Sequence, residues 1–473
     1  MKVEQIYTGC LAQGAYFIQS EGEAVVIDPL REITPYLKKA EKENVKIKYV
    51  LETHFHADFV SGHVDLAKAT GATIIFGPNA NPKFKAHIAT DGEELKVGKI
   101  TIKVLHTPGH TMESSTYLLS DENNKPHAIF SGDTLFIGDV GRPDLAAKSG
   151  LTVEDLAGTL YDSLRSKIMP LPDDVLVYPA HGAGSACGKN MSKETFDILG
   201  HQKKVNYALR ETMTKVEFIK ELTTDLMPPP SYFPLNVRMN KEGYENISEV
   251  IKKGTHAMNP EEFELVANET GALKLDVRGA ISFSKGFIPN SINIGIDGGF
   301  APWVGTLIPD IKQQILLITD EGREEETVIR LARVGYDNTI GYLKGGFNAW
   351  KNAGKEVDIV KSVSVQTFVD AYKTNPKINI LDVRKKNEYN LEHIVDAENL
   401  PLDFINDGMP SIDKNKTYYV HCAGGYRSMI YTSILKSRGY DNLINVENGF
   451  KPIITAGPEI KTIANTCPSE NKI

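Results

Sequence analysis

The sequence predicts an α/β protein made of successive globular parts. Its 473 residues are enough for about three domains of ~100–200 residues each. In the first half, apolar strand-like segments end in histidine or aspartate. In the second half, strand-like and helical segments alternate, and the whole pattern occurs twice. Such alternation predicts parallel sheets with helices on both faces.

Composition and charge exclude several classes of protein. Hydrophobic residues make up 41% and charged residues 24%, which is ordinary for a globular protein, and the net charge is −8. Nothing resembles a basic surface for nucleic acid or for a membrane. No signal-peptide core is visible at the start, and no apolar run reaches the ~18 residues of a membrane span. We therefore expect neither nucleic-acid nor membrane partners.

The cysteines indicate the compartment. The four are far apart and have no paired spacing: Cys10, Cys187, Cys422 and Cys467. This distribution favours reduced thiols over a disulfide framework, so we expect a cytoplasmic protein.

The first domain is expected at 1–240, followed by an ordered connector at 241–254. Strand patterns are followed by helical ones, and the predicted elements are strands at 15–18 and 24–28 and helices at 33–43, 64–70 and 192–226. The run Pro228-Pro229-Pro230 ends the last helical pattern, because proline cannot continue a helix.

Histidine and aspartate follow several of these strand patterns. The stretch T-H-F-H-A-D-F begins at Thr53, directly after the apolar residues 47–51. His54 and His56 are two positions apart, so both side chains can point into one cavity. Three further strand patterns are followed by His110, Asp133 and His181. Four strand ends that carry these residue types to one rim predict a metal site.

The rest of the chain contains an internal repeat of about a hundred residues, which predicts domains at 255–358 and 359–473. Short landmarks recur in the same order in both copies: Leu275-Asp276-Val277-Arg278 with Leu381-Asp382-Val383-Arg384, and Gly345-Gly346-Phe347 with Asn448-Gly449-Phe450.

The second copy carries H-C-A-G-G-Y-R-S from His421. Cys422 stands at a strand end, before a glycine loop and a helix start, where backbone N–H groups and the helix end favour a thiolate. Four residues separate it from Arg427. A loop this short suits a bound sulfur atom, and we expect Cys422 to be catalytic, with Arg427 and the loop amides stabilising a persulfide anion. A merely structural buried cysteine is the alternative. In the first copy Asp320 stands at the cysteine position, and a carboxylate cannot carry sulfane sulfur, so we interpret this copy as a catalytically inactive spacer or docking surface.

These motifs resemble known families. The first domain resembles the metallo-β-lactamase superfamily, an αββα sandwich with metal at one edge of its two sheets. The repeats resemble rhodanese domains, and their order resembles persulfide dioxygenase–rhodanese fusions. In the persulfide dioxygenase branch the iron ligands fall on His54, His110 and Asp133. Two histidines and one carboxylate that leave other coordination positions of the metal open are typical of non-haem Fe(II) sites, although zinc binds the same residue types.

The resemblance also predicts how many metal ions bind. Binuclear members carry a further histidine at the position of Phe59, and phenylalanine cannot bind metal. A second cation would keep only Asp58, His181 and a shared Asp133. We therefore expect one Fe(II) per chain, with His56, Asp58 and His181 as outer groups that orient ligands or bound water.

Two other residues have alternative interpretations. Arg142 either grips a substrate carboxylate or phosphate by a forked hydrogen bond, or forms a salt bridge with Asp139 or Asp144. Cys187 lies in a glycine-rich loop after His181 and either relays sulfur beside the metal or has no role.

The resemblance implies a function. A low-molecular-weight thiol persulfide and O₂ would react at Fe(II) to give sulfite, and Cys422 would pass sulfane sulfur to sulfite to give thiosulfate, in sulfide detoxification. Glutathione, coenzyme A, bacillithiol or another thiol could be the carrier, and a homo-oligomer is expected. The alternatives are a binuclear zinc glyoxalase II-type thioester hydrolase fused to a sulfurtransferase, and a non-catalytic binding protein.

Overall fold

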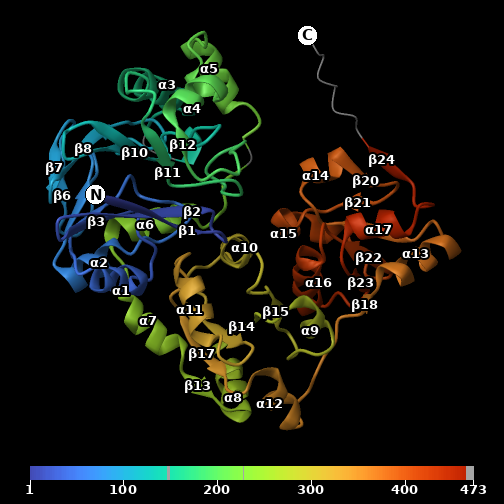
Figure 1. Ribbon diagram of the computed structural model, residues 1–473. Coiled ribbons are helices and arrows are strands. Elements are labelled where there is room, and N and C mark those ends of the chain that lie inside the picture. The colour runs from blue at the N-terminus through green and yellow to red at the C-terminus, as the bar shows by residue number, and fades with distance from the viewer. Residues whose placement is uncertain (146–149, 227, 465–473) are drawn as a thin grey trace. The chain divides into compact units, whose positions relative to one another are not determined.

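The computed structural model describes residues 1–145, 150–226 and 228–464 (Figure 1). The chain forms two compact units: Met1–Val250 with Ile329–Asp337, and Ile251–Val328 with Asn338–Ile473. The domain boundaries expected at 240, 254 and 358 stay predictions.

The first unit contains two six-stranded sheets. The first sheet runs in the order β1 (Lys2–Thr8), β2 (Gln13–Ser20), β3 (Glu23–Ile27), β4 (Lys46–Leu51), β5 (Thr73–Phe76), β6 (His87–Ile88). The second runs in the order β12 (Asp197–Ile198), β11 (Leu176–Pro179), β10 (Pro126–Gly132), β9 (Ser115–Ser120), β8 (Ile100–His106), β7 (Glu94–Val97). Apolar side chains of both sheets, such as Ile18 and Val25 from one and Val104 and Phe130 from the other, form a shared core.

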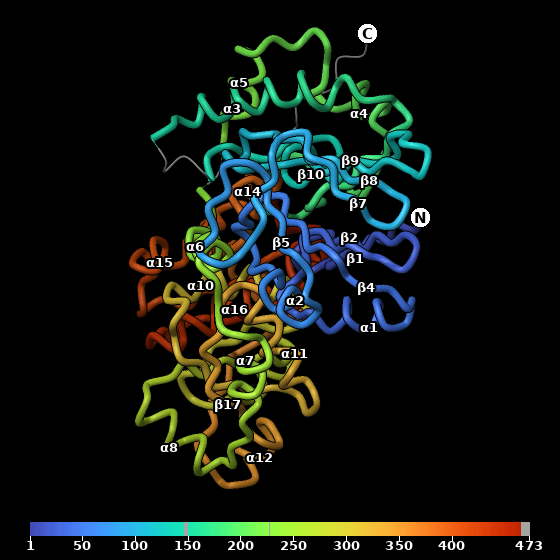
Figure 2. Tube along the Cα trace, turned by 90° about the vertical axis from the view of Figure 1, so that its left-hand side faces the viewer, coloured from blue at the N-terminus to red at the C-terminus, as the bar shows by residue number. Residues whose placement is uncertain are grey.

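Helices cover the outer face of each sheet, and the four layers are visible in Figure 2. The first sheet packs on α1 (Thr34–Lys42) and α2 (His63–Thr70). The second packs on α3 (Val153–Ser163), on a π-helical turn at Leu164–Ile168, and on α5 (Lys215–Thr223). The predicted αββα sandwich is confirmed.

The helix predicted over 192–226 is wrong. That segment contains β12, then α4 (Leu199–Val205), a 3₁₀ turn at Tyr207–Leu209, and α5. The break lies at Asn206, which is fully buried and donates from Nδ2 to the carbonyls of Phe136 and Asp139, while its Oδ1 accepts from the Ala208 N–H. A buried asparagine that bonds to backbone in this way competes with the helix ladder.

The segment after the prolines is helical. It forms α6 (Phe233–Glu242) and α7 (Ile247–Gly254). Asn240 of α6 is buried and donates from Nδ2 to the carbonyls of His56 and Phe59, and its side-chain Oδ1 accepts from the Ser61 N–H. This helix therefore holds the histidine-rich loop in place.

The second unit contains two five-stranded sheets whose strands all pair in parallel, as predicted. The first copy has strands β13 (Ala257–Met258), β17 (Thr339–Leu343), β16 (Ile315–Ile318), β14 (Leu273–Asp276) and β15 (Ile292–Asn293) in spatial order. The second has β18 (Ser362–Val363), β23 (Leu443–Val446), β22 (Tyr418–His421), β19 (Asn379–Asp382) and β21 (Glu398–Asn399).

Helices surround each sheet. The first copy has α8 (Pro260–Thr270), α9 (Ala280–Ser284), α10 (Phe300–Leu307), α11 (Glu324–Ala332) and α12 (Gly346–Asn352). The second has α13 (Val365–Thr374), α14 (Lys386–Leu391), α15 (Ile405–Gly408), α16 (Tyr426–Ser437) and α17 (Phe450–Ala456), with a small ribbon of β20 (Glu392–Ile394) and β24 (Thr462–Ala464).

The repeated L-D-V-R landmark has a structural cause. In the first copy the buried Asp276 carboxylate accepts from Arg278 Nε at 2.9 Å and from Nη2 at 2.5 Å. Asn293 then donates to the carbonyls of both residues. Asp382, Arg384 and Asn399 repeat this arrangement in the second copy. The pattern shared by the two copies is therefore a buried ion pair at the end of one strand, joined to the neighbouring strand by the asparagine.

No helix in residues 1–145, 150–226 and 228–464 is long and apolar enough to cross a membrane. Cys10, Cys187 and Cys422 are free thiols, and Cys467 lies outside the described residues.

Removing the arginine of the landmark should destabilise the second unit. We expect Arg278→Met to lower the free energy of unfolding by about 3–5 kcal/mol, because the buried Asp276 charge loses its partner. Trp303 and Trp350, the two tryptophans of the chain, lie in this copy and report the transition by fluorescence. Lys351→Met on the exposed side of α12 is the control, with a change within about 0.5 kcal/mol. Equal unfolding midpoints for Arg278→Met and Lys351→Met would contradict the proposed role of the buried ion pair.

Candidate metal centre and thiol loop

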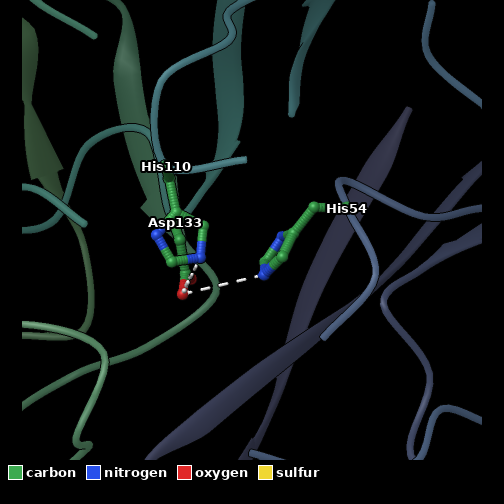
Figure 3. Close-up of side chains that lie close together, drawn as sticks. All are labelled: His54, His110 and Asp133. Atoms are coloured by element: carbon green, nitrogen blue, oxygen red, sulfur yellow. Dashed lines mark ion pairs between the residues drawn. The ribbon is translucent and has the colours of Figure 1, made fainter. Parts of the chain in front are cut away.

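Three of the predicted ligands converge. His54 follows β4, His110 follows β8 and Asp133 follows β10, and all three are buried. Asp133 Oδ2 lies 3.8 Å from His54 Nε2 and 3.5 Å from His110 Nε2 (Figure 3). That oxygen has no hydrogen-bond partner within the described part of the chain. Metal bonds of about 2.0–2.2 Å place donor atoms roughly this far apart, so the residues fit one metal ion.

Hydrogen bonds orient both imidazoles. His54 Nδ1 lies 3.0 Å from Thr53 Oγ1, whose hydroxyl donates to Asp28 at 2.8 Å. His110 Nδ1 lies 2.8 Å from the carbonyl of Arg142. Nε2 of each ring is thereby left for a metal. Burial, followed by the neighbouring His56, lowers the pKa of His54 well below 6.5, so this ring is neutral and able to coordinate at pH 7.

His181 lies between two carboxylates. Its Nδ1 is 2.8 Å from Asp133 Oδ1 and its Nε2 is 2.8 Å from Asp58 Oδ2. Burial alone would lower the pKa of His181, but the charges of Asp133 and Asp58 raise it well above 6.5. Burial likewise opposes ionisation of Asp133, yet the facing histidines hold the pKa of Asp133 far below its usual range. An imidazolium therefore binds one oxygen of Asp133, and the other oxygen faces the metal position.

Phe59 adds an apolar wall to this region. Its side chain is completely buried, and its ring centroid lies 4.3 Å from His56 and 6.3 Å from His181. His56, Asp58 and His181 still place donor atoms within 4.8 Å of one another. The side chain of Phe59 has no nitrogen or oxygen atom, so a second cation would have fewer ligand atoms here.

His56 also lies beside a second group of acids. Its Nε2 is 3.2 Å from Asp28 Oδ1 and 3.6 Å from Glu52 Oε2. Burial and the Asp28 charge raise the pKa of Glu52 well above 4.5. His63 Nδ1 lies 3.5 Å from the other oxygen of Glu52, and burial together with His56 lowers the pKa of His63 to about 3.

Four residues that support the site were not predicted from the sequence. Asp28 and Glu52 had a usable signal, since each stands directly at the end of a strand, as the predicted ligands do. Thr53 was read only as the first residue of the motif. Asn240 had no signal, because it reaches the loop from α6, 184 positions after His56.

Arg142 and Cys187 lie close to the metal position. Arg142 is buried and forms a forked pair with Asp144, at 2.7 Å from Nε and 2.5 Å from Nη2, and its N–H donates to the carbonyl of Cys187. Burial, followed by the charges of Asp58 and Asp133, raises the pKa of the Cys187 thiol well above 9, so the sulfur is protonated here. The roles in substrate binding and sulfur relay stay predictions.

The thiol loop closes around Cys422. The sulfur is buried and accepts a hydrogen bond of 3.1 Å from the N–H of Gly425. Gly425 has a φ of +87° and caps the 12-residue helix α16, so the positive end of the helix faces the sulfur. Arg427 pairs with Glu388 at 2.6 and 2.8 Å. The loop therefore presents the Gly425 amide to the sulfur, while the Arg427 guanidinium is paired with Glu388.

The first copy has no such centre. Asp320 is exposed, and the helix that follows begins with three acids at 324–326. Arg323 pairs with Asp297 and Glu326. That this copy is catalytically inactive stays a prediction.

The low pKa of His63 makes folding depend on pH. Its pKa is near 6.5 in the unfolded chain and about 3 in the fold, so unfolding takes up a proton between these values. Stability from this residue is therefore lost as pH falls below 6.5, by about 2 kcal/mol at pH 5. We expect His63→Gln to remove this pH dependence of the free energy of unfolding. The parent should therefore exceed the variant in free energy of unfolding by less at pH 5 than at pH 7.5.

Pulse proteolysis in urea at both pH values measures this difference, with fragments of the first unit quantified. A difference between parent and variant that does not change with pH would show that His63 is not buried in its neutral form.

Comparisons with known proteins agree with the two folds. Residues 8–181 match the Metallo-beta-lactamase superfamily, and residues 259–353 and 365–456 match the Rhodanese-like domain. The protein of Homo sapiens named persulfide dioxygenase ETHE1, mitochondrial, is 30% identical over 220 residues, 46% of this chain and 78% of that protein. A probable hydroxyacylglutathione hydrolase of Schizosaccharomyces pombe is 30% identical over 181 residues, 37% of this chain and 66% of that protein.

A solved structure extends the likeness across the domains. The crystal structure of a metallo-beta-lactamase from Staphylococcus aureus subsp. aureus COL has a TM-score of 0.64 and 33% sequence identity, and the match covers 72% of this chain and 98% of that chain. Together with the buried ligand set and the thiol loop, these matches show that the chain belongs to the metallo-β-lactamase superfamily and joins one domain of that fold to two rhodanese-like domains.

Proposed function

We propose that this protein is a mononuclear Fe(II) persulfide dioxygenase that oxidises low-molecular-weight thiol persulfides to sulfite, joined to a sulfurtransferase at Cys422 that yields thiosulfate. The observation that carries this proposal is the convergence of His54, His110 and Asp133 Oδ2 on one point, with His181 holding the other oxygen of Asp133. The human persulfide dioxygenase among the relatives supports it. Cytoplasmic location and a homo-oligomer stay predictions.

The residues of the site prepare it for this chemistry. Fe(II) bound by two imidazoles and one carboxylate supplies redox chemistry with O₂ that closed-shell zinc does not. Thr53 and the Arg142 carbonyl fix the imidazoles, and burial keeps His54 neutral. The protonated His181 limits Asp133 to a single free oxygen.

Phe59 is the residue on which the single-metal proposal depends. We expect Phe59→His to raise the bound metal from about one to about two ions per chain, because it adds a nitrogen donor beside Asp58 and His181. Metal analysis by mass spectrometry after dialysis against iron or zinc measures this. Phe55→His, whose parent ring packs 4.7 Å from Phe76 in a separate apolar cluster, is the control and should keep one ion. Two ions in the unmodified protein would contradict the proposal.

The sulfurtransferase step needs no oxidant. The Cys422 thiolate attacks the terminal sulfur of R–S–SH, the carrier's S–S bond breaks, and the carrier leaves as R–S⁻ while Cys422 holds the S–SH group. After loss of the proton, sulfite attacks the outer sulfur and leaves as thiosulfate, which restores the thiolate. The Gly425 N–H and the start of α16 face the negative sulfur.

Loss of the thiol should separate the two activities. We expect Cys422→Ser to release sulfite in place of thiosulfate and to keep oxygen uptake within about twofold, because the metal site is in the other unit. An oxygen electrode combined with ion chromatography measures uptake and products. Cys10→Ser, which changes another free thiol, should behave like the parent. Undiminished thiosulfate from Cys422→Ser would show that the thiol loop is not the transferase.

The second candidate is a zinc thioester hydrolase of the glyoxalase II type with a fused sulfurtransferase, which the hydroxyacylglutathione hydrolase relative favours. Metal analysis and activity discriminate the two. Iron with persulfide-dependent oxygen uptake, abolished by chelation, supports the dioxygenase. Zinc with thioester cleavage and no oxygen uptake supports the hydrolase.

A further inference from the structure

One face of helix α16, the helix that follows the thiol loop, contacts the first rhodanese-like copy (Figure 1). The Tyr426 hydroxyl donates to the carbonyl of Gly295 at 2.7 Å, and Ser433 Oγ accepts from the N–H of Asn293 at 2.9 Å. Met429 packs in an apolar cluster with two phenylalanines of the first copy. These three residues of α16 are three and four positions apart, so they lie on the same side of the helix. The cysteine-less copy therefore supports the helix whose start faces the thiol.

The ring of Tyr426 lies against a glycine-rich turn of the first copy. This turn, at 294–299, joins β15 to α10. A Cβ atom at Gly298 would lie 2.4 Å from two atoms of the Tyr426 ring, and a Cβ atom at Gly295 would lie 3.3 Å from it. Neither glycine has a φ in the left-handed region, so the backbone conformation does not require glycine at these positions. The Tyr426 ring is therefore what excludes a side chain at Gly298.

Backbone hydrogen bonds fix the glycine turn to the end of β14. The N–H of Ile294 donates to the carbonyl of Asp276 at 3.1 Å, and the N–H of Ile296 donates to the carbonyl of Val277 at 2.9 Å. Both isoleucine side chains are buried in the first copy. The turn is thus held by its own sheet, and it gives the Tyr426 ring a fixed position.

Tyr426 is the neighbour of the residue that binds the sulfur. Gly425 donates its N–H to Cys422 Sγ at 3.1 Å and caps α16, of which Tyr426 is the first residue. A hydrogen bond weakens steeply when its angle departs from linearity. A displacement of Tyr426 would move the adjoining peptide group of Gly425, so the position of the Tyr426 ring controls the bond that the sulfur accepts.

We propose that Tyr426 is a positioning residue for sulfur transfer: the glycine turn of the cysteine-less copy holds its ring and thereby keeps the Gly425 N–H directed at the Cys422 sulfur. This inference rests on the proposed sulfurtransferase function and gives the first copy a part in it. Tyr426 acts through its neighbour and exchanges no atoms in the transfer written above.

The test combines Gly298→Ala with Tyr426→Ala in the full-length, metal-loaded protein without oxygen, so that the metal site cannot consume the persulfide. Mass spectrometry follows the gain of one sulfur at Cys422 from glutathione persulfide. We expect Gly298→Ala alone to slow this loading at least about fivefold, because its methyl group displaces the ring. Added to Tyr426→Ala, where the ring is absent, the same change should alter the rate by no more than about twofold.

Alkylation of Cys422 by iodoacetamide is a second measurement, which needs no sulfur donor. Alkylation requires the thiolate, which the Gly425 N–H stabilises, whereas a loosened loop would expose this buried thiol and speed the reaction. We expect Gly298→Ala to slow alkylation at least about threefold at pH 7. Tyr426→Phe keeps the ring in the turn and should stay closer to the parent than Tyr426→Ala. Gly279→Ala is the control and should match the parent in both assays, because a Cβ atom there meets nothing within 4 Å.

Three results would overturn the inference: parent rates for Gly298→Ala, an equal loss from Gly298→Ala with and without the Tyr426 ring, or faster alkylation in Gly298→Ala. Absence of any sulfur gain in the unmodified protein would instead contradict the proposed transferase function, and this inference with it.

Discussion

A buried imidazolium between two carboxylates is the interaction on which the metal centre depends. His181 contacts Asp133 on one side and Asp58 on the other in a buried region, where both carboxylates raise the pKa of His181 and the facing histidines lower the pKa of Asp133. Separating these charges would leave an unpaired buried ion, which is costly. The ion pair therefore directs the free oxygen of Asp133 towards His54 and His110. A binuclear relative would need a cation where this chain has a protonated ring and the side chain of Phe59.

The fold was predictable because its signals are local. Each ligand follows an apolar strand, so a metal site at strand ends could be predicted from the sequence, and the resemblance to the persulfide dioxygenase branch implied that His54, His110 and Asp133 are its ligands. The L-D-V-R repeat was equally visible, although its cause, the Asp276–Arg278 pair, appears only in three dimensions.

Other features depend on contacts between distant segments. Asn240 supports the histidine loop from another helix, and Asn206 breaks a helical pattern through bonds to the carbonyls of Phe136 and Asp139. The packing of Phe283 and Phe287 against Val360 and Met429 likewise joins segments that are far apart in the sequence. Residue spacing contains no information on such contacts.

The most direct test of the single-metal account is a crystal structure of the purified protein with anomalous diffraction measured at the iron and zinc absorption edges. The account predicts one iron peak, within bonding distance of His54 Nε2, His110 Nε2 and Asp133 Oδ2, with His181 still between Asp133 and Asp58. Two well-occupied zinc peaks, one of them bound by Asp58 and His181, would contradict it.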